Sequence, residues 1–373
     1  MSHHVPFAHV DRENAALVDE FLPVLKEQLA GGVFVGGEEV DRLERRIAHL
    51  HQVEHAVAVN SGTDALRLTV RALGIPRGST GVTVANTFVA TVGALLSEGL
   101  DPLLVDVGDD ENVDVAALEE AITPDTRLVV AVHLRGLPAE IGAIRELCER
   151  RGIVLLEDCA QAVLATAGGV PVGGFGIAGC FSLHPLKNLG ACGDAGVVVT
   201  NDAELAGELR LLRNHGLRDR DTVVRWGENS RLDALQAGLL NVKLDRLAEW
   251  TERRRDLAAL YDDLLAGLPV VTPPRPDDRV HVYHRYAIMT DQRDALRSHL
   301  SRLGVGTAVH YPVPIHRQPA AADGRVRTAA RGLAVTERQA ARTLSLPLHP
   351  LMSEREIRAA ADGVRSFFDH HAR

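Results

Sequence analysis

Short apolar runs alternate with amphipathic stretches from residue 55 to residue 160, and this alternation most limits the folds open to the chain. The apolar runs lie at 55–59, 82–86, 102–107, 127–134 and 152–160. Strands this apolar are typical of a mostly parallel sheet with helices on both faces, so we expect an α/β fold. Ligands of such sheets bind beyond the carboxyl ends of the strands. The residues just past predicted strand ends are Ser61, Thr87, His133 and Asp158.

The pattern of alternating strands and helices ends before the turn-rich segment at 269–278 (PVVTPPRPDD), and a different arrangement of predicted elements surrounds that segment. A long helical pattern at 231–266 precedes it, and a predicted strand at 281–289 and a helix near 291–303 follow it. A chain of 373 residues is long for one core and fits two domains. We expect a large domain at 1–245, including an N-terminal helical segment, and a smaller C-terminal α+β domain at 246–373.

Composition argues against several classes of function. The net charge is −9 and no basic stripe is present, so nucleic acid is not an expected ligand. No run reaches the roughly 18 apolar residues of a membrane span, and the N-terminus does not resemble a signal peptide. The four cysteines form no CxxC pair, and neither His281 with His284 nor His370-His371 is typical of a metal site. We therefore expect a cytoplasmic protein with no membrane contact and no bound metal.

The segment Asn60-Ser61-Gly62-Thr63 closes one predicted strand and opens a predicted helix. Backbone N–H groups at a helix start, two hydroxyls and a glycine that permits close approach suit a phosphate. Taken alone, the segment fits a simple helix N-cap by Ser61 or Thr63 better. The sequence contains neither GxxxxGK[ST] nor a GxGxxG after a strand, so it is not a P-loop or a dinucleotide fingerprint.

Two further segments offer a carboxylate and a lysine. Asp158 follows Glu157 at the end of the fifth predicted strand, where it could hold a cationic ring nitrogen or cap a helix. Lys187 lies in FSLHPLKNLGACGDAG (181–196), between a proline and several glycines. A lysine there is less typical of a solvated surface than one on a helix face, and desolvation lowers the pKa of an amine so that it can form a Schiff base.

The order of these segments is more informative than any one of them. A phosphate-binding turn, then a carboxylate at a strand end, then a lysine about 30 residues later is the order expected for pyridoxal 5'-phosphate. The lysine would form the Schiff base, the carboxylate would keep the pyridine nitrogen protonated, and the turn would hold the phosphate. The sequence thus predicts this cofactor, with Lys187 and Asp158 as its catalytic partners.

The chain resembles the DegT/StrS family of sugar aminotransferases, which have the fold-type I architecture. The resemblance covers nearly the whole chain. The matching segments are VNSGTDAL (59–66), NTFVAT (86–91), VHLRGLPAE (132–140), EDCAQA (157–162), FSLHPLKNLGACGDAG, LRNHG (212–216), GENSRLDALQAGLL (227–240), HYPVPIH (310–316) and LSLPLHP (344–350).

The resemblance implies a role for each matching residue. Gly62, Thr63 and Ser182 would bind the cofactor phosphate, and Phe88 would stack on the pyridine ring. Asn229 would reach the phosphate from the partner subunit, so the resemblance implies a homodimer with shared active sites.

The remaining implied roles concern the reacting end of the cofactor and the substrates. Asp158 would pair with the ring nitrogen, Gln161 would lie near the phenolic oxygen, and Lys187 would carry the Schiff base. His310 and Tyr311 would line the substrate entrance. Arg231 could bind a carboxylate of the amino-acid donor, or it could form a structural salt bridge instead.

Three positions depart from the family pattern. Val84 stands where the family usually has a proline, and Ala195 where it has a glycine. His184 fills a position that is often aromatic, and we expect it to pack beneath the lysine segment rather than to act in catalysis. None of these changes removes a residue with an implied chemical role.

The resemblance implies transfer of an amino group from glutamate or glutamine to a nucleotide-linked keto sugar, with the amine placed at carbon 3 or carbon 4 of a deoxyhexose. The segment KNLG…GD resembles members that act at carbon 3. An inosose-type cyclitol ketone is an alternative acceptor. A sugar dehydratase of the same family would have histidine in place of Lys187, and a non-catalytic regulator would be expected to lack Lys187 or Asp158.

Overall fold

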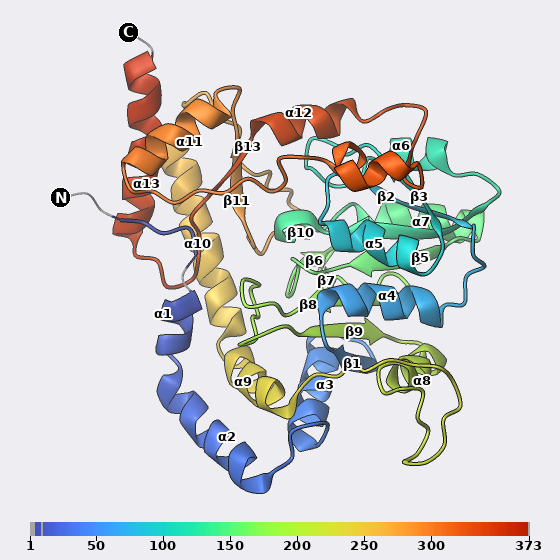
Figure 1. The fold of residues 1–373 in the computed structure, drawn as a ribbon. Coiled ribbons are helices and arrows are strands. Elements are labelled where there is room, and N and C mark those ends of the chain that lie inside the picture. The colour runs from blue at the N-terminus through green and yellow to red at the C-terminus, as the bar shows by residue number, and fades with distance from the viewer. Residues whose placement is uncertain (1–3, 9, 372–373) are drawn as a thin grey trace.

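The computed structural model describes residues 4–8 and 10–371, and its largest element is an eight-stranded sheet flanked by helices (Figure 1). The strand order is β1-β9-β8-β5-β4-β2-β3-β12. Five of the seven pairings are parallel, and β9 runs antiparallel to both β1 and β8. The bounds are β1 His55–Val59, β2 Thr80–Val84, β3 Asp101–Val105, β4 Thr126–Val132, β5 Val154–Asp158, β8 Ala178–Ser182, β9 Gly196–Thr200 and β12 Arg327–Thr328. The expected mostly parallel α/β fold is confirmed.

Alternating side chains divide the core of the large sheet between its two faces. On one face, residues such as Val198 pack against α4 (Gly62–Ala72), α5 (Val89–Ser97) and α8 (Ala203–Leu212). On the other face, Val197 packs against α3 (Glu38–Leu50) and α9 (Ala234–Leu244). Val129 packs on that same face against α6 (Val115–Ala121) and α7 (Ile141–Arg151). Burial on both faces explains why the strands are apolar throughout.

A second hydrophobic core is built from the C-terminal part of the chain. The antiparallel strands β11 (Tyr286–Met289) and β13 (Thr343–Leu346) pack with α10 (Leu247–Leu265), α11 (Arg293–Arg302) and α13 (Glu354–His371). Val5, from the N-terminal segment, is fully buried in the same core. The shorter and connecting elements are α1 Val10–Ala15, α2 Val18–Gly31, η1 Leu134–Gly136, β6 Thr166–Ala167, β7 Val170–Pro171, β10 Arg279–Val280, η2 Ile315–Arg317, η3 Pro319–Asp323 and α12 Ala334–Arg342.

Two expected elements differ from the structure. The helical pattern at 231–266 is two helices, because the chain turns at Asp245 and Arg246 between α9 and α10. The strand expected at 281–289 begins only at Tyr286, because the preceding residues bond elsewhere: Tyr283 has a positive φ of 47°, and the Val282 N–H donates to the carbonyl of Gly136.

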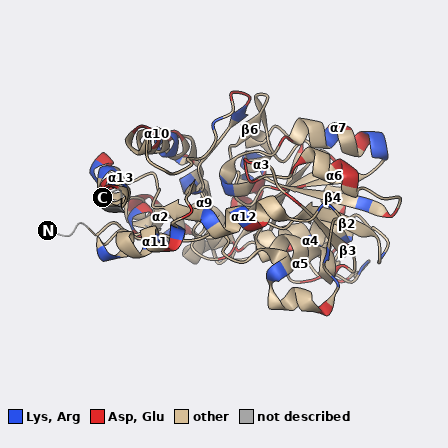
Figure 2. Cartoon of the chain, turned by 90° about the horizontal axis from the view of Figure 1, so that it is seen from above, with Lys and Arg blue, Asp and Glu red and all other residues tan. Residues whose placement is uncertain are grey.

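Basic and acidic residues are interspersed along the outer helices (Figure 2). No helix among the described residues is long and apolar enough to cross a membrane. The side chains of His370 and His371 lie outside the described part of the chain.

Candidate active site

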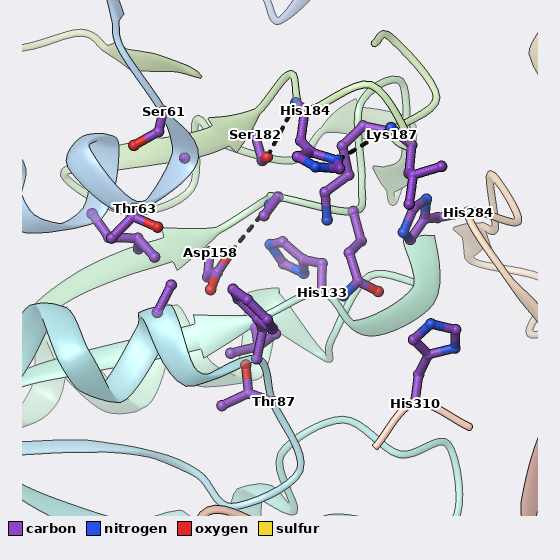
Figure 3. Close-up of a pocket in the computed structure, with 18 of the residues that line it drawn as sticks. Ser61, Thr63, Thr87, His133, Asp158, Ser182, His184, Lys187, His284 and His310 are labelled. Atoms are coloured by element: carbon purple, nitrogen blue, oxygen red, sulfur yellow. Dashed lines mark hydrogen bonds between the residues drawn. The ribbon is translucent and has the colours of Figure 1, made fainter. Parts of the chain in front are cut away.

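A cavity of about 470 Å³ opens beyond the carboxyl ends of the central strands. Its walls come from segments far apart in the sequence, and Figure 3 shows their labelled side chains surrounding a common space. The strand pattern predicts that four residues at or just past the ends of β1, β2, β4 and β5 lie near a ligand, and all four line the cavity: Ser61, Thr87, His133 and Asp158.

The N-terminus of α4 forms one wall of the cavity. The Ser61 hydroxyl accepts a hydrogen bond from the Asp64 N–H at 3.1 Å, so Ser61 is a helix cap. A Cβ at Gly62 would lie 2.6 Å from the Cβ of Ser182, so only glycine fits there. The first turn of α4 is therefore packed directly against the end of β8, and Gly62, Thr63 and Ser182 face the same space. A helix N-terminus with nearby hydroxyls can bind an anion while its cap remains in place.

Asp158 lies at the end of β5 and is 5% exposed. One carboxylate oxygen accepts a hydrogen bond from the Thr91 hydroxyl at 2.7 Å, and the other accepts one from the Ala160 N–H at 3.1 Å. The Thr91 hydroxyl in turn lies 2.8 Å from that of Thr87. These contacts fix the direction of the carboxylate, and its remaining lone pairs are available to a cationic group in the cavity.

Glu157, the neighbour of Asp158, points away from the cavity and is fully buried. Its carboxylate accepts four hydrogen bonds: from the backbone N–H groups of Gly173, Phe175 and Gly176, each at 2.8 Å, and from His133 Nε2 at 3.0 Å. His133 Nδ1 accepts from the Ala139 N–H, which leaves the proton on Nε2. His133, Glu157 and Cys159 lie close enough together to suggest a metal site. Because the histidine nitrogens and the carboxylate oxygens are already engaged, we interpret the cluster as structural.

Lys187 extends into the cavity from the segment between β8 and β9. The backbone N–H of Lys187 donates to the His184 carbonyl at 2.8 Å. The segment is tightly folded, because a Cβ at Gly190 would lie only 2.5 Å from the Pro185 carbonyl oxygen. The buried ammonium of Lys243 donates to the carbonyl of Gly190 at 2.7 Å, which anchors the end of the segment. His184 is exposed at the cavity edge and accepts from the Leu186 N–H. The expectation that His184 packs beneath the lysine segment is therefore wrong, because its ring closes a turn at the surface.

Desolvation lowers the pKa of Lys187 from 10.5 to about 8. The Asp158 carboxylate opposes this shift, whereas the Arg285 guanidinium adds to it. Lys187 is therefore neutral, and hence nucleophilic, at a much lower pH than a solvated lysine.

This shift predicts the pH dependence of covalent capture of pyridoxal phosphate by cofactor-free protein. The neutral amine reacts, so the capture rate should rise with pH, and it should level off above about pH 8 because the pKa is lowered. Stopped-flow absorbance from about pH 6 to pH 10.5 would measure it, with N-acetyl-lysine methyl amide as the control whose rate keeps rising to about pH 10.4. A protein midpoint equal to that of the model amine would contradict the desolvated site.

Aromatic and polar side chains close the cavity opposite α4. The ring of Phe88 is 52% exposed and lies 6.0 Å from the ring of Tyr311. Gln161 donates to the Tyr311 hydroxyl at 3.2 Å, and burial raises the pKa of that hydroxyl to about 12. His310 Nδ1 contacts the Ser345 hydroxyl at 3.0 Å, and burial lowers the pKa of His310 to about 3, so its ring is neutral. A planar ring entering the cavity would find the exposed face of Phe88.

The structure does not bring two of the predicted residues into this cavity. Asn229 is exposed and pairs through its backbone with Asn214, and Arg231 donates to the Asn214 side chain at 3.0 Å. Asn229 does not cap α9 either, because that helix begins at Ala234 with Asp233 as its N-cap. Within one chain, neither side chain lines the cavity.

Two residues of the site were not predicted. His284 and Arg285 line the cavity from the segment just before β11. Burial lowers the pKa of His284 well below its ordinary value, so it is neutral. The sequence gives no local signal for either residue, because only the packing of the C-terminal core against the lysine segment brings them to the cavity.

Comparison with known proteins identifies the relatives of this chain. The DegT/DnrJ/EryC1/StrS aminotransferase family model matches residues 16–365. A UDP-N-acetyl-3-dehydro-alpha-D-glucosamine 3-aminotransferase of Acidithiobacillus ferrooxidans is 40% identical, with 97% of each chain covered. A dTDP-3-amino-3,4,6-trideoxy-alpha-D-glucose transaminase of Streptomyces venezuelae is 39% identical, with 97% of this chain and 96% of the relative covered. A protein named as a pleiotropic regulatory protein in Geobacillus stearothermophilus is 38% identical, with coverage of 99% and 100%.

Comparison with solved structures gives the same result as comparison of sequences. A crystal structure of DesV from S. venezuelae, in complex with a ketimine intermediate, superposes with a TM-score of 0.94 at 40% identity and covers 98% of both chains. NtdA from Bacillus subtilis, solved with its bound cofactor PMP, superposes with a TM-score of 0.91 at 30% identity. That alignment covers 99% of this chain and 86% of NtdA.

Proposed function

The chain belongs to the DegT/DnrJ/EryC1/StrS aminotransferase family, and we propose that it transfers an amino group from glutamate or glutamine to carbon 3 of a nucleotide-linked keto sugar. It is a pyridoxal phosphate-dependent transaminase with the fold-type I architecture, as the sequence predicts. The observation that carries the proposal is that Lys187, Asp158 and the N-terminus of α4 face one cavity.

The side chains of the cavity fit the cofactor. The phosphate would bind the N-terminus of α4, where Gly62 leaves room and where Thr63 and Ser182 supply hydroxyls. Phe88 would cover one face of the pyridine ring. Gln161 would lie near the phenolic oxygen.

Asp158 would hold the pyridine nitrogen in its protonated form. Its carboxylate is almost fully buried, so its attraction for a cation is weakly screened. The hydrogen bond from Thr91 keeps the carboxylate directed and does not require a proton on it. When bound, pyridoxal phosphate supplies an aldehyde that accepts the amino group and a cationic ring that withdraws electrons from the reacting carbon.

Lys187 would perform two tasks in turn. Its neutral amine would hold the cofactor until the amino donor takes its place. The released amine, with a pKa lowered to about 8, would then remove the proton from the donor carbon and deliver it within the cavity. A pKa near the working pH suits both the removal and the return of a proton.

The names of two relatives support the proposed position of the new amine. The names of the A. ferrooxidans and S. venezuelae relatives both place the amino group at carbon 3. They differ in the nucleotide, which is UDP in one and dTDP in the other. These names support a 3-keto acceptor for this chain and leave the nucleotide open.

A substrate panel tests this function directly. Purified holoenzyme with glutamate or glutamine would be incubated with UDP- and dTDP-linked 3-keto and 4-keto sugars and with a keto-cyclitol, and the amine would be located by NMR. We expect an amine at carbon 3 of a nucleotide sugar. Preferential amination of a 4-keto sugar or of the cyclitol would contradict the proposed acceptor, and no turnover with any acceptor would favour a regulatory role like that named for the G. stearothermophilus relative.

We also propose a homodimer in which Asn229 of one subunit completes the phosphate site of the other. Asn229 is exposed and lies outside the cavity of its own chain, as such a role requires. An exposed apolar group, Val223, Val224 and Trp226, lies on the same segment and would suit a subunit contact.

Subunit mixing tests the shared site. When inactive Lys187→Ala and Asn229→Ala variants exchange subunits, each heterodimer has one intact site of two, so random exchange should restore about a quarter of wild-type activity. Lys187→Ala mixed with Asp158→Asn is the matched control, because both changes fall in the same chain's cavity and no intact site can form. A monomer by sedimentation, or verified exchange with no recovery, would contradict the shared site.

A further inference from the structure

The Arg285 side chain is placed between two cavities. It lines the main cavity with Lys187, and it also lines a smaller pocket formed by the N-terminal segment and α10. Its guanidinium lies over the ring of Phe7, 5.1 Å from the ring centre, and Phe7 stacks on His310 with 5.8 Å between ring centres. The N-terminal segment is itself fixed by a hydrogen bond from the Val5 N–H to the Gly304 carbonyl at 2.9 Å. The guanidinium plane is thus supported on one side by an aromatic ring.

Arg285 has no anionic partner among the described residues, whereas the arginines around it do. Arg135 pairs with Glu111 at 2.6 Å, and Arg254 lies 3.7 Å from Glu13. No ion pair or side-chain hydrogen bond of Arg285 occurs in the described chain, and its Nε is buried without a partner. A desolvated guanidinium without a partner costs folding free energy, so the site is arranged to receive an anion.

The Arg285 guanidinium stays charged at neutral pH, although burial and a neighbouring cation both oppose its charge. Burial and the nearby Arg254 lower the pKa of Arg285 to about 10. Arg285 and Lys187 line the main cavity together and also the smaller pocket, so their side chains are neighbours. The charge of Arg285 accordingly lowers the pKa of Lys187. Two acidic residues, Asp158 and Asp194, line the cavity. The proposed function assigns Asp158 to the cofactor, and neither carboxylate forms an ion pair with Arg285 in the described chain.

We propose that Arg285 binds the α-carboxylate of the amino donor and so determines which amines can act as donors. This inference rests on the proposed function, because it assigns the donor side of the same cavity. The α-carboxylate is attached to the carbon from which Lys187 takes the proton, so its binding group must lie beside Lys187. Arg285 meets this condition within a single chain. A guanidinium forms two parallel hydrogen bonds with a carboxylate, which also orients the donor carbon.

Arg231, the residue considered for this role from the sequence, is less suitable within one chain. It lies outside the cavity, and its guanidinium donates to Asn214. The diphosphate of the acceptor is another anion that could reach Arg285. The position beside Lys187 favours the carboxylate, and the experiment separates the two.

The test compares donors rather than overall turnover. The change in cofactor absorption caused by the donor alone, with no sugar present, is followed in stopped flow for wild type, Arg285→Gln, Arg285→Lys and Arg231→Gln. Binding of a nucleotide sugar to the same proteins is measured separately. The donors are glutamate and 4-aminobutyrate, which lacks the α-carboxylate. Arg302→Gln, an exposed arginine at the end of α11, is the matched control.

We expect Arg285→Gln to lower kcat/KM for glutamate by about 10- to 100-fold, and 4-aminobutyrate by less than about twofold. Arg285→Lys should show an intermediate loss for glutamate, because it keeps the charge and loses the paired donors. Competitive inhibition by 2-methylalanine, an unreactive α-amino acid whose only carboxylate is the α one, should weaken in parallel. Arg302→Gln should match wild type.

Three outcomes would overturn the assignment. The first is an equal loss for both amines, and the second is a loss confined to Arg231→Gln. The third is an unchanged donor reaction with weaker binding of the nucleotide sugar, which would assign the diphosphate to Arg285. If Arg285→Gln does not fold, as judged by its melting curve and cofactor content, Arg285→Lys carries the same comparison. Because the donor reaction needs no sugar, it can succeed even if the proposed acceptor is wrong.

Discussion

Replacing Lys187 with alanine should lower kcat for amino transfer by at least about 10⁴-fold. The residue is expected both to hold the cofactor and to move the proton, and no second amine lines the cavity among the described residues. The chain has only two other lysines, Lys26 on the exposed face of α2 and Lys243, whose ammonium is bonded to the Gly190 carbonyl. Single-turnover kinetics with preloaded enzyme would measure the loss of proton transfer separately from the loss of cofactor.

Lys26→Ala is the matched control and should retain wild-type activity, because the Lys26 side chain is exposed and does not line the cavity. Added methylamine should partly restore the proton transfer of Lys187→Ala if the missing function is that of a base. Retention of more than about a tenth of wild-type kcat by Lys187→Ala would show that another group moves the proton.

Replacing Asp158 with asparagine should lower kcat by about 10²- to 10³-fold while much of the cofactor stays bound. The α4 N-terminus and Ser182, which are expected to hold the phosphate, are untouched by this change. The asparagine oxygen can still accept the hydrogen bond from Thr91, although the Ala160 N–H then loses its acceptor. This loss is local to one turn, so the fold should persist. The ring nitrogen, however, would lose the buried negative charge that keeps it protonated. Steady-state kinetics and the cofactor content of the purified variant measure the two effects.

Asp109→Asn, a change at a fully exposed side chain, serves as the control for removing one carboxylate. The pH profile adds a second readout, because a weakly held ring proton should be lost at lower pH in Asp158→Asn than in wild type. Near-wild-type turnover in Asp158→Asn would exclude the carboxylate as the group that maintains the protonated ring.

The local sequence pattern predicts the parallel strands well, because a strand that is buried on both faces is apolar along its whole length. The run at 127–134 covers most of β4, Thr126–Val132, and the run at 152–160 contains β5, Val154–Asp158. The strands β8 and β9 were not predicted. The second of them, Gly196–Thr200, is as buried as the others yet runs antiparallel to both neighbours. Strand direction depends on the path of the lysine segment between β8 and β9, and no local periodicity encodes that path.

The site shows the same division between local and long-range information. Gly62, Thr63, Asp158 and Lys187 come from short segments whose composition already suggests their chemistry, and the structure brings all four to one cavity. Arg285 belongs to a segment that looks like an ordinary strand, and only the contact between the C-terminal core and the lysine segment brings it to the cavity. The domain division expected between residues 245 and 246, the cytoplasmic location and the contribution of Asn229 stay predictions.

Reductive labelling of the holoenzyme tests the central assignment most directly. Borohydride would fix the cofactor on the amine that holds it, and peptide mass spectrometry would identify that amine among the three lysines of the chain. The account predicts one pyridoxyl group per chain on Lys187, and none on Lys187→Ala. A label on Lys26 or Lys243, or bound cofactor that borohydride cannot fix to any lysine, would contradict it.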